Sequence, residues 1–109
     1  MSAVEGSLIP VATLGEVPPG TKLGRIVAGV RVLLVNAGNG IQAYEDRCSH
    51  RDVRLCEGSL EGRLLTCKAH EWRYDVDTGC AIERPGVRLR RYKVRLEAAR
   101  ILVEIGGAR

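Results

Sequence analysis

The sequence predicts an all-β fold, in which an antiparallel strand framework, like a sandwich or barrel, carries a small inserted subdomain. The chain has 109 residues, enough for one domain with one core but not for a separate catalytic domain. It contains no Phe and one Trp, so the core must come from Val, Leu and Ile, and this composition favours strands. Short alternating apolar and polar runs dominate, and no window keeps a helical period over about ten residues.

Four short runs in the first half of the chain predict strands. A turn at Pro18-Pro19-Gly20 separates the first run from the second, and Gly29 separates the second from the third. Ala37-Gly38-Asn39-Gly40 contains Asn-Gly, a strong hairpin signal, so the third and fourth runs should pair. One short turn of helix is compatible with Thr13–Glu16. The expected strands are Leu8–Ala12, Lys22–Val27, Val30–Asn36 and Ile41–Glu45.

The second half of the chain predicts two shorter strands and a final hairpin. A turn at Asp77-Thr78-Gly79 follows the shorter strands. In the last strand Ile101, Val103 and Ile105 should point inward, because alternate residues of a strand share one face. A segment at roughly residues 46–82 is the expected insert between the two halves of the framework. The expected strands are Arg63–Cys67, Trp72–Asp75, Arg90–Leu96 and Arg100–Ile105.

Charge and composition narrow the class of protein. Seventeen Lys and Arg against 13 Asp and Glu give a formal charge of +4, which suits an acidic docking partner. The aromatic platforms that bind single-stranded nucleic acid are missing, so nucleic acid is not an expected partner. No signal peptide is visible, and the apolar run near Val32–Val35 is far too short to span a membrane. We therefore expect a cytoplasmic monomer without a membrane partner, in which residues 1–109 form a single domain.

Two mixed pairs of metal ligands are the most informative feature of the chain. Cys48-Ser49-His50 is followed by 16 residues and then by Cys67-Lys68-Ala69-His70. Each pair supplies one soft thiolate and one imidazole. This donor set suits a [2Fe–2S] cluster in which one iron takes two Cys and the other takes two His, the Rieske arrangement. A protein built around such a centre transfers single electrons, so we expect an electron carrier and not an enzyme.

Zinc is the main competing interpretation, because two Cys and two His also form a good tetrahedral set. Zinc sites usually keep like ligands together, as Cys-x-x-Cys and His-x-x-x-His, whereas each pair here mixes Cys with His. That arrangement favours two irons side by side over one tetrahedral ion. The two remaining cysteines, Cys56 and Cys80, are expected to be thiols, because a reducing cytosol disfavours a disulfide.

With these ligands in view, the chain resembles the Rieske-type ferredoxins of bacterial multicomponent oxygenases. The resemblance is tightest over four segments: 48–52, 57–62, 67–72 and 75–79. It implies that Cys48 and Cys67 bind the inner iron and that His50 and His70 bind the outer iron at an exposed tip. It further implies that Arg84-Pro85-Gly86 is the proline loop that covers the cluster.

The resemblance also implies partners, a flavin-containing NAD(P)H reductase upstream and an oxygenase downstream. Dioxygenase ferredoxins usually carry Cys-Pro-Leu-His-Gly at the second pair, whereas this chain has Cys67-Lys68-Ala69-His70-Glu71-Trp72. That segment is more similar to ferredoxins of di-iron monooxygenases that act on toluene-type aromatics or alkenes. The alternatives are a ferredoxin of a dioxygenase system and a small subunit held permanently in a larger reductase, as in nitrite reductase assemblies.

The residues around the ligands predict a low reduction potential. High-potential Rieske proteins join the two ligand loops by a disulfide, but Val53 and Ala69 hold those positions here. Trp72 replaces the Ser whose hydroxyl bonds a cluster sulfur in those proteins. With fewer hydrogen bonds to the sulfurs, we expect a potential near the bottom of the Rieske range, about −150 mV. Tyr74 holds the place of a hydroxyl donor to the Cys48 sulfur, which would raise the potential relative to a Phe variant.

Residues that border the ligands are candidates for contacts with partner proteins. The charged candidates are Arg51, Lys68 and Glu71, although a solvated face is an equally good interpretation of such residues. Trp72 either packs against the cluster loop, the interpretation we favour, or forms part of the partner surface. The stripe of Arg91, Lys93 and Arg95 fits an ordinary solvated strand face.

Overall fold

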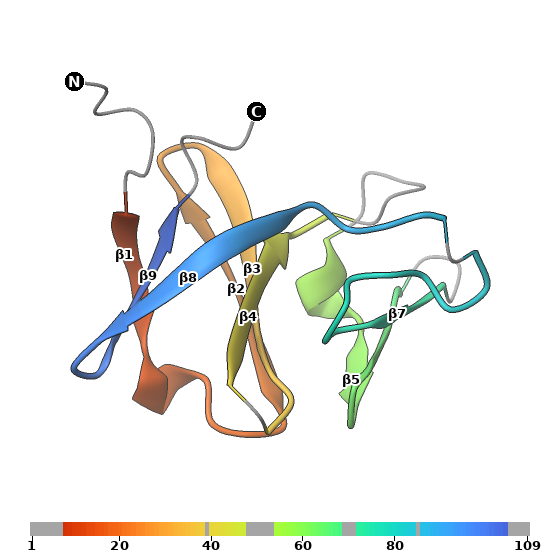
Figure 1. Ribbon diagram of the computed structural model, residues 1–109, viewed down its shortest axis with the longest axis horizontal. Coiled ribbons are helices and arrows are strands. Elements are labelled where there is room, and N and C mark those ends of the chain that lie inside the picture. Colours follow the sequence, from red (N-terminus) through yellow and green to blue (C-terminus); the bar gives the residue numbers. More distant parts are fainter. Residues whose placement is uncertain (1–7, 39, 48–53, 69–71, 85, 105–109) are drawn as a thin grey trace.

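A computed structural model describes residues 8–38, 40–47, 54–68, 72–84 and 86–104, and these residues form two antiparallel sheets (Figure 1). We call the six-stranded sheet the framework sheet and the three-stranded one the small sheet. The framework sheet has the order β1 (Leu8–Thr13), β9 (Arg100–Glu104), β8 (Arg91–Glu97), β4 (Ile41–Glu45), β3 (Val30–Asn36) and β2 (Thr21–Val27). The small sheet has the order β5 (Ser59–Glu61), β6 (Leu64–Thr66) and β7 (Arg73–Asp75).

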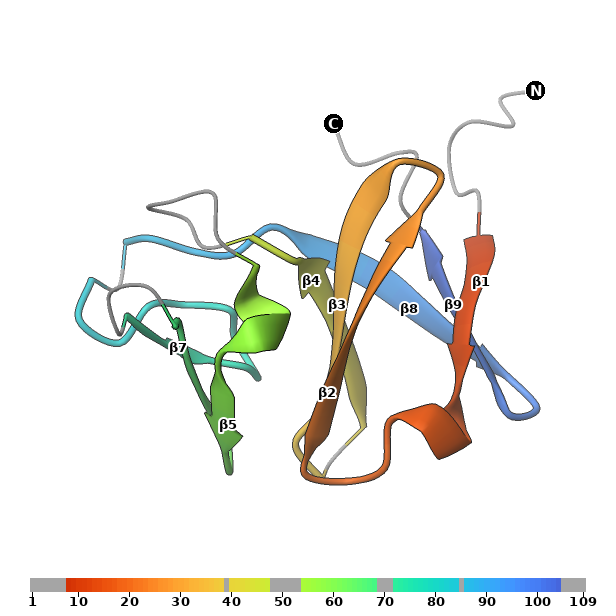
Figure 2. The ribbon, with the colours of Figure 1, turned by 180° about the vertical axis from the view of Figure 1, so that it is seen from behind.

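The framework sheet is built mainly from hairpins whose turns suit their residues. Between β2 and β3, Ala28 and Gly29 form a two-residue connection with φ angles of 51° and 79°. Positive φ at both central residues matches the twist of the flanking strands, as in type I′ turns. The sheet curls so that its edge strands β1 and β2 come into contact, which gives the framework the shape of a half-barrel (Figure 2). The all-β prediction is confirmed.

β3 connects the two halves of the molecule because both of its faces are apolar. Leu33 and Val35 belong to the core between the framework sheet and the small sheet, which we call the inter-sheet core. Val32 and Leu34 point the other way, into the core enclosed by the framework sheet, which we call the framework core. All four side chains are fully buried. A strand covered on both sides carries a continuous apolar run in place of alternation.

The inter-sheet core holds residues from both sheets. The framework contributes Tyr44, whose hydroxyl donates a 2.7 Å hydrogen bond to the carbonyl oxygen of Val76 beyond β7. The small sheet and its surroundings contribute the buried side chains Leu55, Leu65, Cys67, Tyr74, Val76, Ala81 and Leu89. The small sheet therefore packs on the framework and shares its core.

The predicted strands are confirmed, with ends that differ from the expected ones by at most one residue within the described part of the chain. The expected helical turn is the 3₁₀ turn Leu14–Glu16, where the Thr13 amide donates to Glu16 Oε1 at 2.9 Å. Two elements were not predicted, β5 and the 3₁₀ turn Leu55–Glu57, labelled η2. β5 has three residues with a single apolar one, too few to show a period of two. Within the described ranges, no helical segment has the length and apolar character needed to cross a membrane.

Candidate metal centre

The structure describes part of the predicted centre. Cys67 follows the end of β6, and Trp72 and Tyr74 lie before and within β7. The other predicted ligands and several neighbours lie outside the described residues, namely Cys48, His50, Arg51, His70, Glu71 and Pro85. Elsewhere in the described part of the chain, no group of three or more His, Cys, Asp or Glu residues could hold a metal ion.

The second ligand pair is carried by the connection between β6 and β7. These strands pair Leu65 with Tyr74 and Thr66 with Arg73, and the ladder continues one step further. There the amide of Cys67 donates a 2.7 Å hydrogen bond to the carbonyl oxygen of Trp72. The two ends of the segment that contains His70 are thus held together by the hairpin ladder.

Cys67 lies where the chain passes from the interior to the surface. Its own exposed fraction is 0%, and it belongs to the inter-sheet core, whereas the side chain of the next residue, Lys68, is 65% exposed. A thiolate in such a dry position suits the inner iron of a [2Fe–2S] cluster, and a nearby surface suits a second iron that exchanges electrons. The position and chemistry of Cys67 therefore fit the predicted cofactor.

Trp72 packs against the inter-sheet core, whereas most of the cluster loops that it was predicted to contact lie outside the described residues. Its ring is partly buried against the inter-sheet core, and the guanidinium carbon of Arg84 lies 5.4 Å from the ring centroid. That distance is within the range of a cation–π contact. The amide of Val87 donates a 2.8 Å hydrogen bond to the carbonyl oxygen of Arg84. The predicted proline loop thus begins with a residue that contacts the second ligand hairpin.

Tyr74 is fully buried and lies opposite Leu65 in the ladder between β6 and β7. It belongs to the inter-sheet core together with Cys67. The acceptor predicted for its hydroxyl, the Cys48 sulfur, lies outside the described residues. The hydrogen bond from Tyr74 to Cys48 stays a prediction.

The two cysteines outside the ligand pairs are thiols, as predicted, and they differ in environment. Burial, reinforced by the neighbouring Asp46 carboxylate, raises the pKa of Cys56 to about 11. Hydrogen bonds from Thr78 and Arg88 lower the pKa of Cys80. Neither residue lies within the ligand segments.

A residue that sequence reasoning missed lies beside the first ligand pair. Asp46 follows β4 and is fully buried, and its carboxylate accepts hydrogen bonds from Arg54 and from the Cys56 amide. The only sequence signal is an acidic residue two positions before Cys48, which by itself reads as a surface charge.

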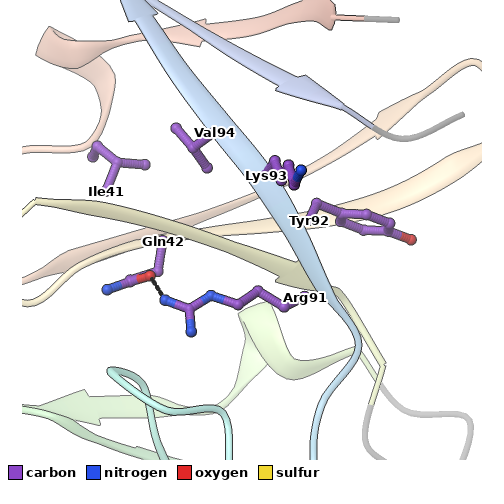
Figure 3. Close-up of a pocket in the computed structure, with 6 residues that line it drawn as sticks. All are labelled: Ile41, Gln42, Arg91, Tyr92, Lys93 and Val94. Atoms are coloured by element: carbon purple, nitrogen blue, oxygen red, sulfur yellow. Dashed lines mark hydrogen bonds between the residues drawn. The ribbon is translucent and has the colours of Figure 1, made fainter. Parts of the chain in front are cut away.

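A separate open hollow lies on the framework sheet between β4 and β8 (Figure 3). Arg91 donates a hydrogen bond to Gln42 across it, and Lys93 lies on the same strand. The lining contains no carboxylate, thiol or imidazole. The hollow therefore has no set of side chains suited to binding a metal ion, and the exposed basic stripe fits a solvated strand face.

Comparison with known proteins decides the family. Residues 7–93 match the model of the Rieske [2Fe-2S] domain. The chain belongs to the Rieske [2Fe-2S] domain family. The family predicted from the two ligand pairs is thereby confirmed, and with it a Rieske-type [2Fe–2S] cofactor and a role in electron transfer rather than catalysis.

Individual relatives are ferredoxins of oxygenase systems. This Rieske chain is 34% identical over 98 residues to the ferredoxin component of the naphthalene 1,2-dioxygenase system of Pseudomonas aeruginosa, covering 89% of this chain and 94% of the relative. It is 40% identical over 73 residues to the ferredoxin component of the alkene monooxygenase system of Xanthobacter autotrophicus, covering 66% and 60%. Among solved structures, a chain from the complex of reduced oxygenase and oxidized ferredoxin in carbazole 1,9a-dioxygenase superposes with a TM-score of 0.79 at 26% identity, covering 92% and 93%.

Proposed function

We propose that this chain is the ferredoxin of a multicomponent oxygenase system. It accepts one electron at a time from a flavin-containing NAD(P)H reductase and delivers it to the oxygenase component. When bound, the [2Fe–2S] cluster supplies a one-electron redox couple. The observation that carries the proposal is the position of Cys67, which is fully buried directly beside a strongly exposed residue in a chain with two mixed ligand pairs.

In this proposal Cys48 and Cys67 hold the inner iron, and His50 and His70 hold the outer iron. Support comes from the ladder that closes the second ligand segment and from the dry environment of Cys67. The protein contributes the position of the ligands and the exclusion of water from the inner side. In this proposal the electron would leave toward a partner through the imidazoles that hold the outer iron.

Lys68 is a docking candidate that the structure describes. Its ammonium group lies 3.8 Å from Glu57 Oε1, and both side chains are more than half exposed. An exposed pair of this kind contributes little to stability, so a partner carboxylate can compete for Lys68 at low cost. An acidic docking face on the oxygenase or the reductase fits both this residue and the net charge of +4.

We propose that the oxygenase partner is a di-iron monooxygenase. The segment Cys67-Lys68-Ala69-His70-Glu71-Trp72 supports it, as does the 40% identity to an alkene monooxygenase ferredoxin. The alternative is a dioxygenase system, which the broader match to a naphthalene dioxygenase ferredoxin favours. A cytoplasmic location and a monomeric state complete the proposal. Obligate co-purification with a larger enzyme would instead indicate a permanent subunit.

The ligand assignment has a test with matched controls inside the same chain. We expect Cys48→Ser and Cys67→Ser to lose the visible absorbance, iron and sulfide of the cluster, whereas Cys56→Ser and Cys80→Ser keep them. His50→Cys and His70→Cys should change the electron paramagnetic resonance spectrum of the reduced protein. A Cys67→Ser protein with a normal cluster, or unchanged spectra in both His variants, would overturn the assignment.

The partner assignment is tested separately by stopped-flow spectroscopy. The reduced protein is mixed with a purified di-iron hydroxylase of the toluene or alkene class, or with a Rieske dioxygenase component. Our proposal expects faster oxidation by the hydroxylase, and Lys68→Glu should slow that reaction most at low salt. Faster oxidation by the dioxygenase would assign the chain to the alternative system.

A further inference from the structure

Asp46 is the only charged residue in the buried class within the part of the chain that the structure describes. It follows β4 directly and precedes the first predicted ligand, Cys48, by two residues. A carboxylate without access to water is costly unless its oxygens are paired. Its partners therefore indicate why the fold retains it.

The partners of Asp46 lie at the far end of the first ligand segment. Oδ1 accepts a 2.8 Å hydrogen bond from the backbone amide of Cys56, and Oδ2 accepts one from Arg54 Nε at 3.3 Å. Meanwhile the Asp46 amide donates to the carbonyl oxygen of Arg31 in β3 at 3.1 Å. One buried carboxylate thus connects the residue where the chain leaves the framework to the residues where it returns. Residues 47–53, which include Cys48 and His50, lie between these ends.

β2 holds this connection from the opposite side. A Cβ atom placed on Gly24 would lie 2.5 Å from the Cys56 sulfur and 2.8 Å from Asp46 Oδ2, so no side chain fits there. Lys22 Nζ, two residues earlier on the same strand, donates a 2.8 Å hydrogen bond to the carbonyl oxygen of Cys56. The backbone of β2 at Gly24 therefore lies directly against η2, and the ammonium group of Lys22 bonds to the same turn.

We propose that Asp46 is the positioning residue of the first ligand segment. It anchors both ends of residues 47–53 to the framework and thereby limits the positions available to Cys48 and His50. This inference rests on the ligand assignment proposed above. The second ligand segment has a different device, the backbone hydrogen bond from Cys67 to Trp72. The first segment, which is longer and not closed by a strand ladder in the described residues, depends on a side chain.

The contacts of Asp46 hold the first ligand segment and are separate from the packing of the framework core. The Asp46 carboxylate accepts hydrogen bonds from Arg54 and from the Cys56 amide, just beyond the end of the segment. The framework core is built from other residues, such as Val32 and Ile101. Loss of the Asp46 contacts should therefore weaken retention of the cluster more than it weakens the framework.

The test compares release of the cluster with stability of the fold. Asp46→Asn keeps the size and one acceptor oxygen but removes the charge that pairs with Arg54. We expect iron transfer from the cluster-loaded protein to an excess of chelator to become about tenfold faster, the factor that loss of one charge-assisted hydrogen bond can produce. Gly24→Ala should act in the same direction because its Cβ would displace Cys56 and the carboxylate.

A second readout does not depend on the redox activity of the protein. The first segment contains Arg47 and Arg51, so trypsin cleavage within it reports how often it opens. We expect faster cleavage at these positions in Asp46→Asn than in the wild type, with cleavage in the final hairpin unchanged. If Asp46→Asn fails to fold, Arg54→Gln replaces it, because that change removes only the partner at the partly exposed side.

Ile101→Val is the matched control, because it lowers stability from the framework core without contact to either ligand segment. The proposal stands if Asp46→Asn releases iron faster than Ile101→Val at an equal decrease of Tm. It is overturned if the two variants release iron equally fast, or if Asp46→Asn keeps the wild-type rate. A normal cluster in Cys48→Ser would show that the ligand assignment itself is wrong, which is a separate result from the comparison of Asp46→Asn with Ile101→Val.

Discussion

The hydrogen bond between Tyr44 and Val76 should contribute measurably to stability, because it joins the framework to the segment that follows β7. Tyr44→Phe removes only the hydroxyl, so the ring keeps its contact with Gly79, where an added Cβ would lie 2.9 Å from Tyr44 Cε1. The carbonyl oxygen of Val76 then loses its side-chain donor in a fully buried site. Such a loss costs about 1.5 kcal/mol, which in a domain of this size lowers Tm by roughly 6–12 °C.

The pH dependence of this effect has a definite sign. Burial raises the pKa of Tyr44 above its usual value of 10.0, so the folded state favours the protonated hydroxyl. The stabilisation is therefore complete below pH 10 and declines as the pH rises through the folded pKa. The difference in stability between the wild type and Tyr44→Phe should shrink above pH 10.

Thermal unfolding of the cluster-loaded protein at a fixed scan rate measures both effects. Tyr92→Phe is the matched control, because Tyr92 is also mostly buried but its hydroxyl has no hydrogen-bond partner among the described residues. The reasoning is refuted if Tyr44→Phe lowers Tm no more than Tyr92→Phe does.

Three further predictions concern the redox centre and its surroundings. Tyr74→Phe should lower the midpoint potential by roughly 20–60 mV, the equivalent of one hydrogen bond to a cluster sulfur. An unchanged midpoint potential in voltammetry would contradict the predicted hydrogen bond. At pH 8, iodoacetamide should modify Cys80 well before Cys56, because a pKa of about 11 leaves roughly a thousandth of Cys56 as thiolate. Mass spectrometry of the intact cluster-loaded protein measures the order of modification, and earlier modification of Cys56 would contradict this prediction. Leu55→Ala should destabilise the protein by about 2–5 kcal/mol by emptying part of the inter-sheet core, and a shift in Tm of under 5 °C would contradict this.

The framework could be predicted from sequence because its strands follow simple rules. Asn-Gly between two apolar runs predicted the hairpin of β3 and β4, and the alternation at Ile101 and Val103 predicted the inward face of β9. Both signals depend only on residues close in sequence. The two ligand pairs could be proposed from sequence because metal chemistry requires particular residue types at short spacing, and their assignment stays a prediction.

The support of the centre could not be predicted, because it depends on contacts between distant segments. Nothing near Gly24 in sequence shows that the strand approaches Cys56, 32 positions later, closely enough to exclude a side chain. Asp46 looks like a surface charge until Arg54 and the Cys56 amide are placed around it. Arg84 resembles any loop arginine until its guanidinium is seen above Trp72.

The shared core explains how a small sheet can hold an electron-transfer centre steady. Three short strands have little apolar surface of their own to bury, and a domain of that size rarely folds without help. Here Leu33, Val35 and Tyr44 of the framework complete the inter-sheet core, in which Cys67 is itself a member. A predicted ligand that belongs to the common core cannot move without disturbing both sheets. The rigidity of the inner side of the centre therefore comes from the framework.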